Sequence, residues 1–134
     1  MDEKYLIDTQ CWLNWHIAPD KLSAKQLQVL QDIDNEIHFS TVSAWEINIK
    51  YRLKKLKLPS LPFRYIPNRI DKDQMKVLPF SLEHSLRIEN LPRHHSDPFD
   101  RLLITQAQIG DMIILTDDPV FELYDVKLML TAPG

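Results

Sequence analysis

Short apolar segments alternate along the chain with longer segments of helical periodicity. Mostly apolar runs favour strands at 5–7, 37–40, 75–78, 112–115 and 126–130. Apolar residues spaced three and four apart predict helices at 12–17, 23–33, 43–57, 81–88 and 97–110, with a short helix from 118. Because the strands are apolar throughout and alternate with helices, the pattern predicts an α/β fold whose parallel sheet is covered on both faces.

Two stretches carry local signals for where helices begin. Ser43 and Glu46 have the spacing of a capping box, which predicts that the third helix opens at Ser43 and runs toward Lys57. Prolines interrupt the stretch that follows, so we expect only a short irregular helix over 63–70.

The composition is that of one folded domain. At 134 residues the chain is long enough for one core and short for two, so we take residues 1–134 as a single domain. Hydrophobic residues make up 44% and charged residues 26%, which argues against disordered and fibrous chains. The two glycines, of which one is the last residue, exclude a glycine-rich phosphate loop and the nucleotide-cofactor enzymes built on it.

Membrane and export signals are missing from the sequence. No apolar run is long enough for a membrane span or for the core of a signal peptide, so we expect a cytoplasmic protein with no membrane association. The single cysteine, Cys11, lies in an apolar stretch and is expected to be a buried thiol.

Carboxylates recur where predicted strands turn into helices. They are Asp8, Glu46, the pair Asp97 and Asp100, and the pair Asp117 and Asp118. Each has a simpler explanation as a helix cap, a capping-box partner or a solvated side chain. Right-handed crossovers, however, send all these helix starts to one edge of the sheet, where ligands bind in open α/β sheets. We therefore expect these carboxylates to converge.

Converging carboxylates repel one another, and a bound cation relieves that repulsion. The all-oxygen donor set favours Mg²⁺ or Mn²⁺ over zinc. The five histidines make no metal-spaced pair, and the adjacent His94 and His95 are interpreted as solvated or substrate-facing loop residues. Metal ions held by acids activate water and neutralise charge on phosphorus, so the acids predict phosphodiester hydrolysis.

A basic segment follows the predicted start of the third helix. Lys50, Arg52, Lys54, Lys55 and Lys57 place five cations within eight residues. Two interpretations stay open: a nucleic-acid track, with Lys50, Arg52 and Lys54 as substrate-binding candidates, or a solvated helix end favoured by the helix dipole. The net charge of −3 argues against bulk electrostatic binding of nucleic acid, but it allows an enzyme with a local basic patch.

Four stretches occur in an order and spacing that resemble a known family. They are Leu6-Ile7-Asp8-Thr9, Ser43-Ala44-Trp45-Glu46-Ile47, the segment from His94 through Asp97-Pro98-Phe99-Asp100 to Ile104, and Leu115-Thr116-Asp117-Asp118-Pro119-Val120-Phe121. With them the chain resembles the PIN-domain ribonucleases, and among these the VapC toxins of bacterial type II toxin–antitoxin pairs. The resemblance implies a PIN-like three-layer α/β/α sandwich around a mainly parallel sheet of four or five strands.

The resemblance also implies roles for the acids. The positions that match the catalytic quartet of a metal-dependent endoribonuclease are Asp8, Glu46, Asp100 and Asp118. Asp8, Asp100 and Asp118 are the implied ligands of one or two Mg²⁺ or Mn²⁺ ions. Glu46 or Asp118 is implied to complete the ligand shell or to take a proton.

Accessory positions follow from the same match. Thr9 and Thr116 stand where the family has hydroxyls beside the acids, and Asp97 is an accessory acid or a cap. Asp117 departs from the pattern, because a basic or neutral residue often stands there in the family. Either its negative charge weakens the approach of the phosphate, or its side chain points outward and has no effect.

Partners are implied by the resemblance as well. Family members are usually homodimers that a small antitoxin neutralises, so we expect an RNA substrate, a cognate antitoxin and a homodimer. The groove that an antitoxin covers is expected from Trp12, Trp15, Phe63 and Tyr65, with core packing as the alternative for both tryptophans.

Other interpretations of the acids are weaker. A receiver domain needs paired acids after the first strand, where only Asp8 stands, and a haloacid-dehalogenase-like phosphatase needs a second aspartate where Gln10 stands. A catalytically inactive PIN-like scaffold that binds RNA or protein is the alternative that stays open.

Overall fold

The computed structural model describes residues 3–130, in which helices and strands alternate as the sequence pattern predicts. The strands are Lys4–Ile7 (β1), Glu36–Ser40 (β2), Lys76–Leu78 (β3), Ile113–Thr116 (β4) and Lys127–Leu130 (β5). The α-helices are Thr9–Ile17 (α1), Ala24–Gln31 (α2), Thr41–Arg52 (α3), Pro62–Lys72 (α4), Leu82–Arg87 (α5) and Pro98–Gly110 (α6). Short 3-10 helices are Pro19–Lys21 (η1), Ile88–Asn90 (η2) and Pro119–Leu123 (η3). None of the helices within these residues has the length and apolarity needed to cross a membrane.

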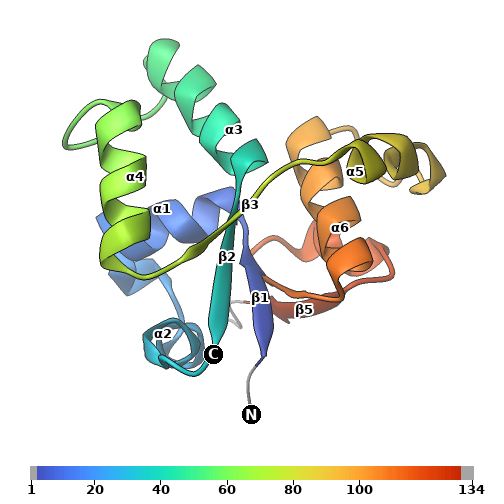
Figure 1. The fold of residues 1–134 in the computed structure, drawn as a ribbon, viewed down its shortest axis with the longest axis horizontal. Helices are drawn as coiled ribbons and strands as arrows, with labels where there is room; N and C mark the ends of the chain where they lie inside the picture. The colour runs from blue at the N-terminus through green and yellow to red at the C-terminus, as the bar shows by residue number, and fades with distance from the viewer. Residues whose placement is uncertain (1–2, 131–134) are drawn as a thin grey trace.

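The strands form one parallel sheet in the order β3-β2-β1-β4-β5 (Figure 1). The chain builds outward from β1 to β3 on one side and then returns to add β4 and β5 on the other. The direction therefore switches between β1 and β4, and a switch point is where open α/β sheets bind ligands. Ile7 of β1 is aligned with Leu115 of β4, so the residues that follow them, Asp8 and Thr116, lie side by side.

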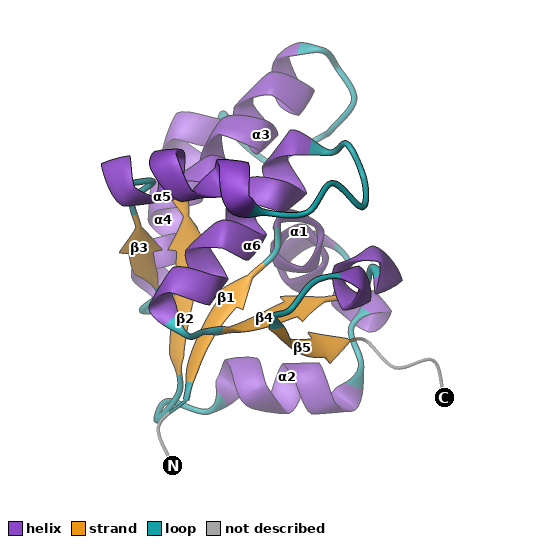
Figure 2. Cartoon of the chain, turned by 90° about the vertical axis from the view of Figure 1, so that its right-hand side faces the viewer, coloured by secondary structure: helices purple, strands orange, loops and turns teal. Residues whose placement is uncertain are grey.

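Helices cover both faces of the sheet, with α1, α2 and α4 on one side and α5 and α6 on the other (Figures 1 and 2). Side chains of β1 alternate between the two faces, as the strand period requires. Tyr5 and Ile7 pack with Trp12 of α1, whereas Leu6 packs with Leu103 of α6. The three layers and the parallel five-stranded sheet confirm the predicted fold class.

The N-cap of α3 is Ser40 and not the predicted Ser43. Strand β2 enters the helix without a loop, and the Ser40 hydroxyl accepts a hydrogen bond from the amide of Val42 at 3.0 Å. Ser43 is buried inside the helix, where its hydroxyl accepts a hydrogen bond from the hydroxyl of Thr9. The predicted capping box is therefore wrong, and Glu46 is not held at the helix start.

Helix α3 also ends earlier than predicted, at Arg52. Lys54 adopts the left-handed conformation with φ of 61°. Its amide donates to the carbonyl of Tyr51 at 3.0 Å, and the amide of Lys55 donates to the carbonyl of Lys50 at 2.9 Å. This pair of bonds satisfies the last carbonyls of the helix and reverses the chain, which stops the helix.

Helix α4 is longer and more regular than the predicted irregular helix over 63–70. Pro62 occupies its first turn, where a missing amide hydrogen costs nothing. Pro67 lies within the helix on an exposed position, where the polar group that the ring leaves without a helical partner does not have to be buried. The two prolines thus mark the start and the exposed face of this helix.

The aromatic residues expected to line a groove lie in different places. Trp12 is fully buried, with its ring 4.9 Å from that of Phe39, and Trp15 packs partly buried against the same core. Trp12 therefore belongs to the core and not to a groove. Phe63 is 68% exposed on α4, and Cys11 is buried as predicted.

The revised start of α3 gives a first testable prediction. Replacing Ser40 with alanine removes the cap and a 2.6 Å hydrogen bond from its hydroxyl to the side chain of Gln106, so we expect the free energy of unfolding to fall by about 1–2 kcal/mol. Ser43→Ala is the matched control, because Ser43 lies inside α3 and does not cap it. Urea unfolding measures both, and a larger loss in Ser43→Ala than in Ser40→Ala would restore the predicted helix start at Ser43.

Candidate functional site

A polar pocket of about 390 Å³ opens where β1 and β4 end and the following helices begin. The structure brings all the acids singled out in the sequence to its wall. The lining residues are Asp8, Thr9, Gln10, Glu46, Lys50, Asp97, Asp100, Asp117, Asp118 and Pro119. Among the described residues that line it, Lys50 is the one cation against six carboxylates.

Asp8 stands at the end of β1 and caps α1 at the same time. One carboxylate oxygen accepts the amide of Cys11 at 2.7 Å, and the other accepts the hydroxyl of Thr116 at 2.5 Å. Only 4% of Asp8 is exposed. Burial raises the pKa of Asp8 to about 6, although the hydrogen bonds from Thr116 and Cys11 oppose that rise.

Thr116 links the ends of the two central strands. Its buried hydroxyl donates to Asp8 and accepts the amide of Asp118 at 3.1 Å. Asp118 in turn caps η3 through the amide of Val120 at 3.0 Å. Thr9, the other hydroxyl predicted beside the acids, lines the pocket but donates its hydrogen to Ser43 of α3 at 2.8 Å.

Asp97 and Asp100 enter the pocket from the first turn of α6. The Asp97 carboxylate caps this helix by accepting the amides of Phe99 and Asp100 at 2.9 and 3.2 Å. Asp97 is therefore a cap that also lines the pocket. The pKa of Asp100 is raised to about 8, first by burial and then by the repulsion of four neighbouring acids, Asp97, Asp8, Glu46 and Asp118.

Glu46 projects into the pocket from α3 and is almost fully buried. The ammonium of Lys50, one turn further along the helix, lies 2.7 Å from its carboxylate. This ion pair spans the rim of the pocket, because 43% of the Lys50 side chain is exposed. The residue thought to be a capping partner is instead an inward-facing acid with its own counterion.

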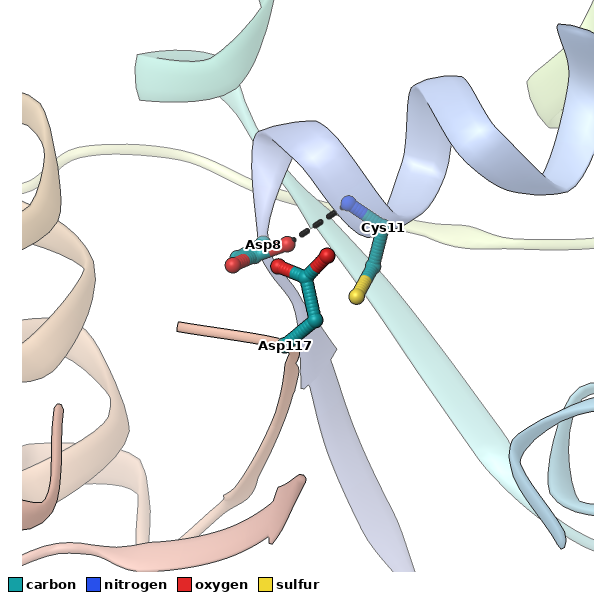
Figure 3. Close-up of side chains that lie close together, drawn as sticks. All are labelled: Asp8, Cys11 and Asp117. Carbon is teal, nitrogen blue, oxygen red and sulfur yellow. Dashed lines mark hydrogen bonds between the residues drawn. The ribbon is translucent and has the colours of Figure 1, made fainter. Parts of the chain in front are cut away.

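Asp117 does not point away from the site. Its carboxylate is directed toward Asp8 and the thiol of Cys11 (Figure 3). One ligand atom from each of these three residues lies within 4.8 Å of the other two. Asp117, which departs from the family pattern, therefore adds a carboxylate directly beside Asp8.

His95 has a role that the sequence did not reveal. It was interpreted as solvated or substrate-facing, but its side chain is only 16% exposed and lies 3.4 Å from the carboxylate of Asp100. Its other ring nitrogen lies 2.7 Å from the hydroxyl of Tyr124, which also accepts a hydrogen bond from Arg101. His94 is exposed and only packs its ring against Tyr124.

Hydrogen-bond direction fixes the tautomer of neutral His95. The ionised carboxylate of Asp100 only accepts, so Nε2 of neutral His95 carries the hydrogen and donates to it. Nδ1 then accepts from the hydroxyl of Tyr124, whose oxygen accepts from Arg101. A directed chain of hydrogen bonds thus runs from buried Arg101 to an acid of the pocket.

The predicted substrate-binding cations do not lie together. Lys50 lines the acidic pocket, whereas Arg52 lines a separate apolar hollow between α3 and α4. Lys54 occupies the left-handed turn after α3 and is exposed. The structure therefore supports only Lys50 of these three as a neighbour of the acids.

The chemistry of the pocket suits a hard divalent cation. Its donors are carboxylate oxygens from four separate segments of the chain, and burial together with repulsion from the neighbouring acids raises the pKa of Asp100 although Lys50 lies in the same pocket. Mg²⁺ and Mn²⁺ prefer such oxygen donors, whereas zinc favours nitrogen and sulfur.

The class of protein is defined by its parallel α/β sandwich with an acidic pocket at the switch point of the sheet. The family profile of the PIN domain matches residues 5–127. The chain belongs to the PIN domain family.

Individual relatives agree with this assignment. Over 57 residues the chain is 40% identical to Ribonuclease VapC16 from Mycobacterium tuberculosis, a match that spans 42% of this chain and 39% of the relative. The fold resembles VapBC2 from Rickettsia felis bound to a DNA fragment from their promoter, with a TM-score of 0.70, 16% identity and coverage of 95% and 98% of the two chains. It also resembles DNA-bound VapBC from Salmonella typhimurium, with a TM-score of 0.71, 13% identity and coverage of 97% and 99%.

The raised pKa values predict how stability depends on pH in metal-free protein. A carboxyl whose pKa is higher in the folded than in the unfolded chain stabilises the fold fully below about pH 4, and that stabilisation is lost progressively as the pH rises from there to the folded-state value. For Asp100 that value is about 8, so we expect the free energy of unfolding to fall between about pH 4 and 8 and to level off above about pH 8.

Urea unfolding in a chelating buffer measures this slope. Asp100→Asn should remove most of it, whereas Asp34→Asn, which makes the same charge change in the exposed turn before β2, should retain it. A wild-type stability that is constant or rises over this range would contradict the raised pKa of Asp100.

The hydrogen-bond chain gives a spectroscopic prediction. Long-range ¹⁵N–¹H spectra of neutral His95, recorded above about pH 8 where Asp100 is ionised, should show the tautomer with hydrogen on Nε2, because Nε2 donates to Asp100 and Tyr124 donates to Nδ1. In Tyr124→Phe the donor to Nδ1 is gone, so a mixture of tautomers is expected. The Nδ1–H tautomer in the wild type would reverse the assigned direction of the chain.

Proposed function

We propose that the protein is a Mg²⁺- or Mn²⁺-dependent endoribonuclease and acts as the toxin of a type II toxin–antitoxin pair. The observation that carries the proposal is the convergence of carboxylates from four segments in one pocket at the switch point of the sheet. Membership of the PIN domain family and the similarity to Ribonuclease VapC16 support it.

In this proposal Asp8, Asp100 and Asp118 would hold the ion, and Glu46 would complete its surroundings or take a proton. When bound, the ion supplies water activation and neutralises charge on the phosphodiester. Hydrogen bonds within the protein hold these carboxylates in position. Both oxygens of Asp8 accept a hydrogen bond from the protein, so their remaining lone pairs are held in one orientation.

Lys50 has a separate part in the proposed reaction. Its exposed ammonium at the rim supplies a positive charge for the incoming phosphate, and its bond to Glu46 holds that carboxylate on the pocket side of α3. The Asp117 carboxylate adds negative charge beside Asp8 and increases the need for a cation.

The proposed partners are RNA, a small cognate antitoxin and a second copy of the chain. Two of the similar solved structures are VapBC assemblies, and this chain exposes large apolar side chains that a partner could cover. A hollow of about 640 Å³ between α3 and α4 is lined by Trp45, Ile49, Leu61 and Phe63, and we assign it to the antitoxin. Because cellular RNA is the proposed substrate, the proposed location is the cytoplasm.

Cleavage of defined tRNA and rRNA with and without Mg²⁺ tests the activity. Asp8→Asn and Asp100→Asn should each lower the rate by at least about 100-fold while keeping the fold, because each removes a ligand charge from the proposed ion. Asp34→Asn is the control with the same charge change outside the pocket. Cleavage by a folded Asp8→Asn/Asp100→Asn double variant would refute the assignment, and no cleavage by the wild type would favour the inactive scaffold.

A further inference from the structure

A second hollow, of about 360 Å³, lies directly beside the acidic pocket. Gln10 and Lys50 line both, so the two hollows adjoin. The charge of the lining residues changes from mostly negative in the acidic pocket to positive in the second hollow. The second hollow is lined by four lysines, Lys21, Lys50, Lys55 and Lys57, and by no carboxylate. We call it the basic groove.

The basic groove is built by the way α3 ends. The left-handed turn at Lys54 reverses the chain, so that the segment after it passes along α1. In that segment exposed and half-buried residues alternate. Leu56 and Leu58 pack against the core, which leaves Lys55 and Lys57 exposed between them. Two leucine anchors therefore hold two lysines at the surface.

Lys21 reaches the basic groove from η1, at the far end of α1. Cations from three separate segments are thus gathered on one surface of a chain whose net charge is −3. Lys21, Lys55 and Lys57 form no ion pair with any residue between 3 and 130, whereas Lys50 is paired with Glu46. Their charges attract an external anion.

Apolar side chains line the basic groove together with the lysines. Leu13, Ile17 and Leu56 contribute to its lining between the lysines. A surface that combines spaced cations with apolar contacts suits a single nucleic-acid strand, which presents phosphates together with sugars and base faces. An acidic protein segment would satisfy the lysines but has no reason to continue into a pocket of six carboxylates.

We infer that the basic groove binds the phosphates of the RNA strand that leads away from the bond cut in the acidic pocket. The inference rests on the proposed ribonuclease function and adds the side on which the strand leaves, toward α1 and η1. Lys50 stands at the junction and contacts the phosphate nearest the acids. Lys21, Lys55 and Lys57 bind the phosphates further along.

Binding of a labelled single-stranded RNA in a chelating buffer tests the basic groove without cleavage. The triple variant Lys21→Gln/Lys55→Gln/Lys57→Gln should bind more weakly, and the slope of log affinity against log salt should fall by roughly 0.7 for each lysine, or about 2 in all. The control triple Arg52→Gln/Lys54→Gln/Lys72→Gln makes the same charge change outside the groove and should keep most of the slope.

Cleavage with Mg²⁺ separates this inference from the proposed function. The groove variant should raise KM for a long RNA with kcat unchanged, and it should cut a dinucleotide, which fills only the acidic pocket, as the wild type does. If the wild type cleaves no RNA, the proposed function is refuted, but the RNA-binding measurement still tests the basic groove. Equal losses of RNA binding in the two triple variants would overturn the inference, and so would unchanged RNA binding by the groove variant. If the groove variant binds RNA normally but binds an acidic peptide more weakly, the groove belongs to a protein partner.

Discussion

Electrostatic repulsion among carboxylates at the switch point of the sheet is the constraint on which the proposed site depends. The parallel topology places the ends of β1 and β4 side by side and directs helix starts toward them. Six acids consequently surround one pocket, and burial together with their repulsion raises the pKa of Asp100 to about 8. Such an arrangement stabilises the folded chain only when protons or a cation reduce the negative charge.

The fold offsets part of this repulsion by giving the acids structural partners. Asp8, Asp97 and Asp118 each cap a helix, so backbone amides hold one of their oxygens. Capping and ligation are therefore compatible uses of one carboxylate, because an amide occupies one lone pair and leaves others for the pocket. Thr116 and His95 add donors to Asp8 and Asp100 from behind, which fixes their orientation.

The sequence predicted the features that follow from repeating patterns. The alternation of strands and helices was enough to predict the fold class, and the handedness of the crossovers was enough to predict that acids distant in sequence converge. Features that depend on one residue's conformation were missed. The capping box failed because β2 enters α3 directly, and the basic groove was hidden because a lysine, rather than glycine, adopts the left-handed turn at position 54. The part played by His95 depends on Tyr124, which lies 29 residues away in sequence and offers no local signal.

The most direct test of the central claim is calorimetric titration of Mn²⁺ in buffers of different ionisation enthalpy. If a cation replaces the proton that burial and repulsion place on Asp100, binding at about pH 7 should release about one proton, and binding at about pH 9 should release almost none. Asp100→Asn should bind Mn²⁺ more weakly and release no proton at about pH 7. Absence of binding by the wild type, or binding with the same proton release at both pH values, would contradict the account.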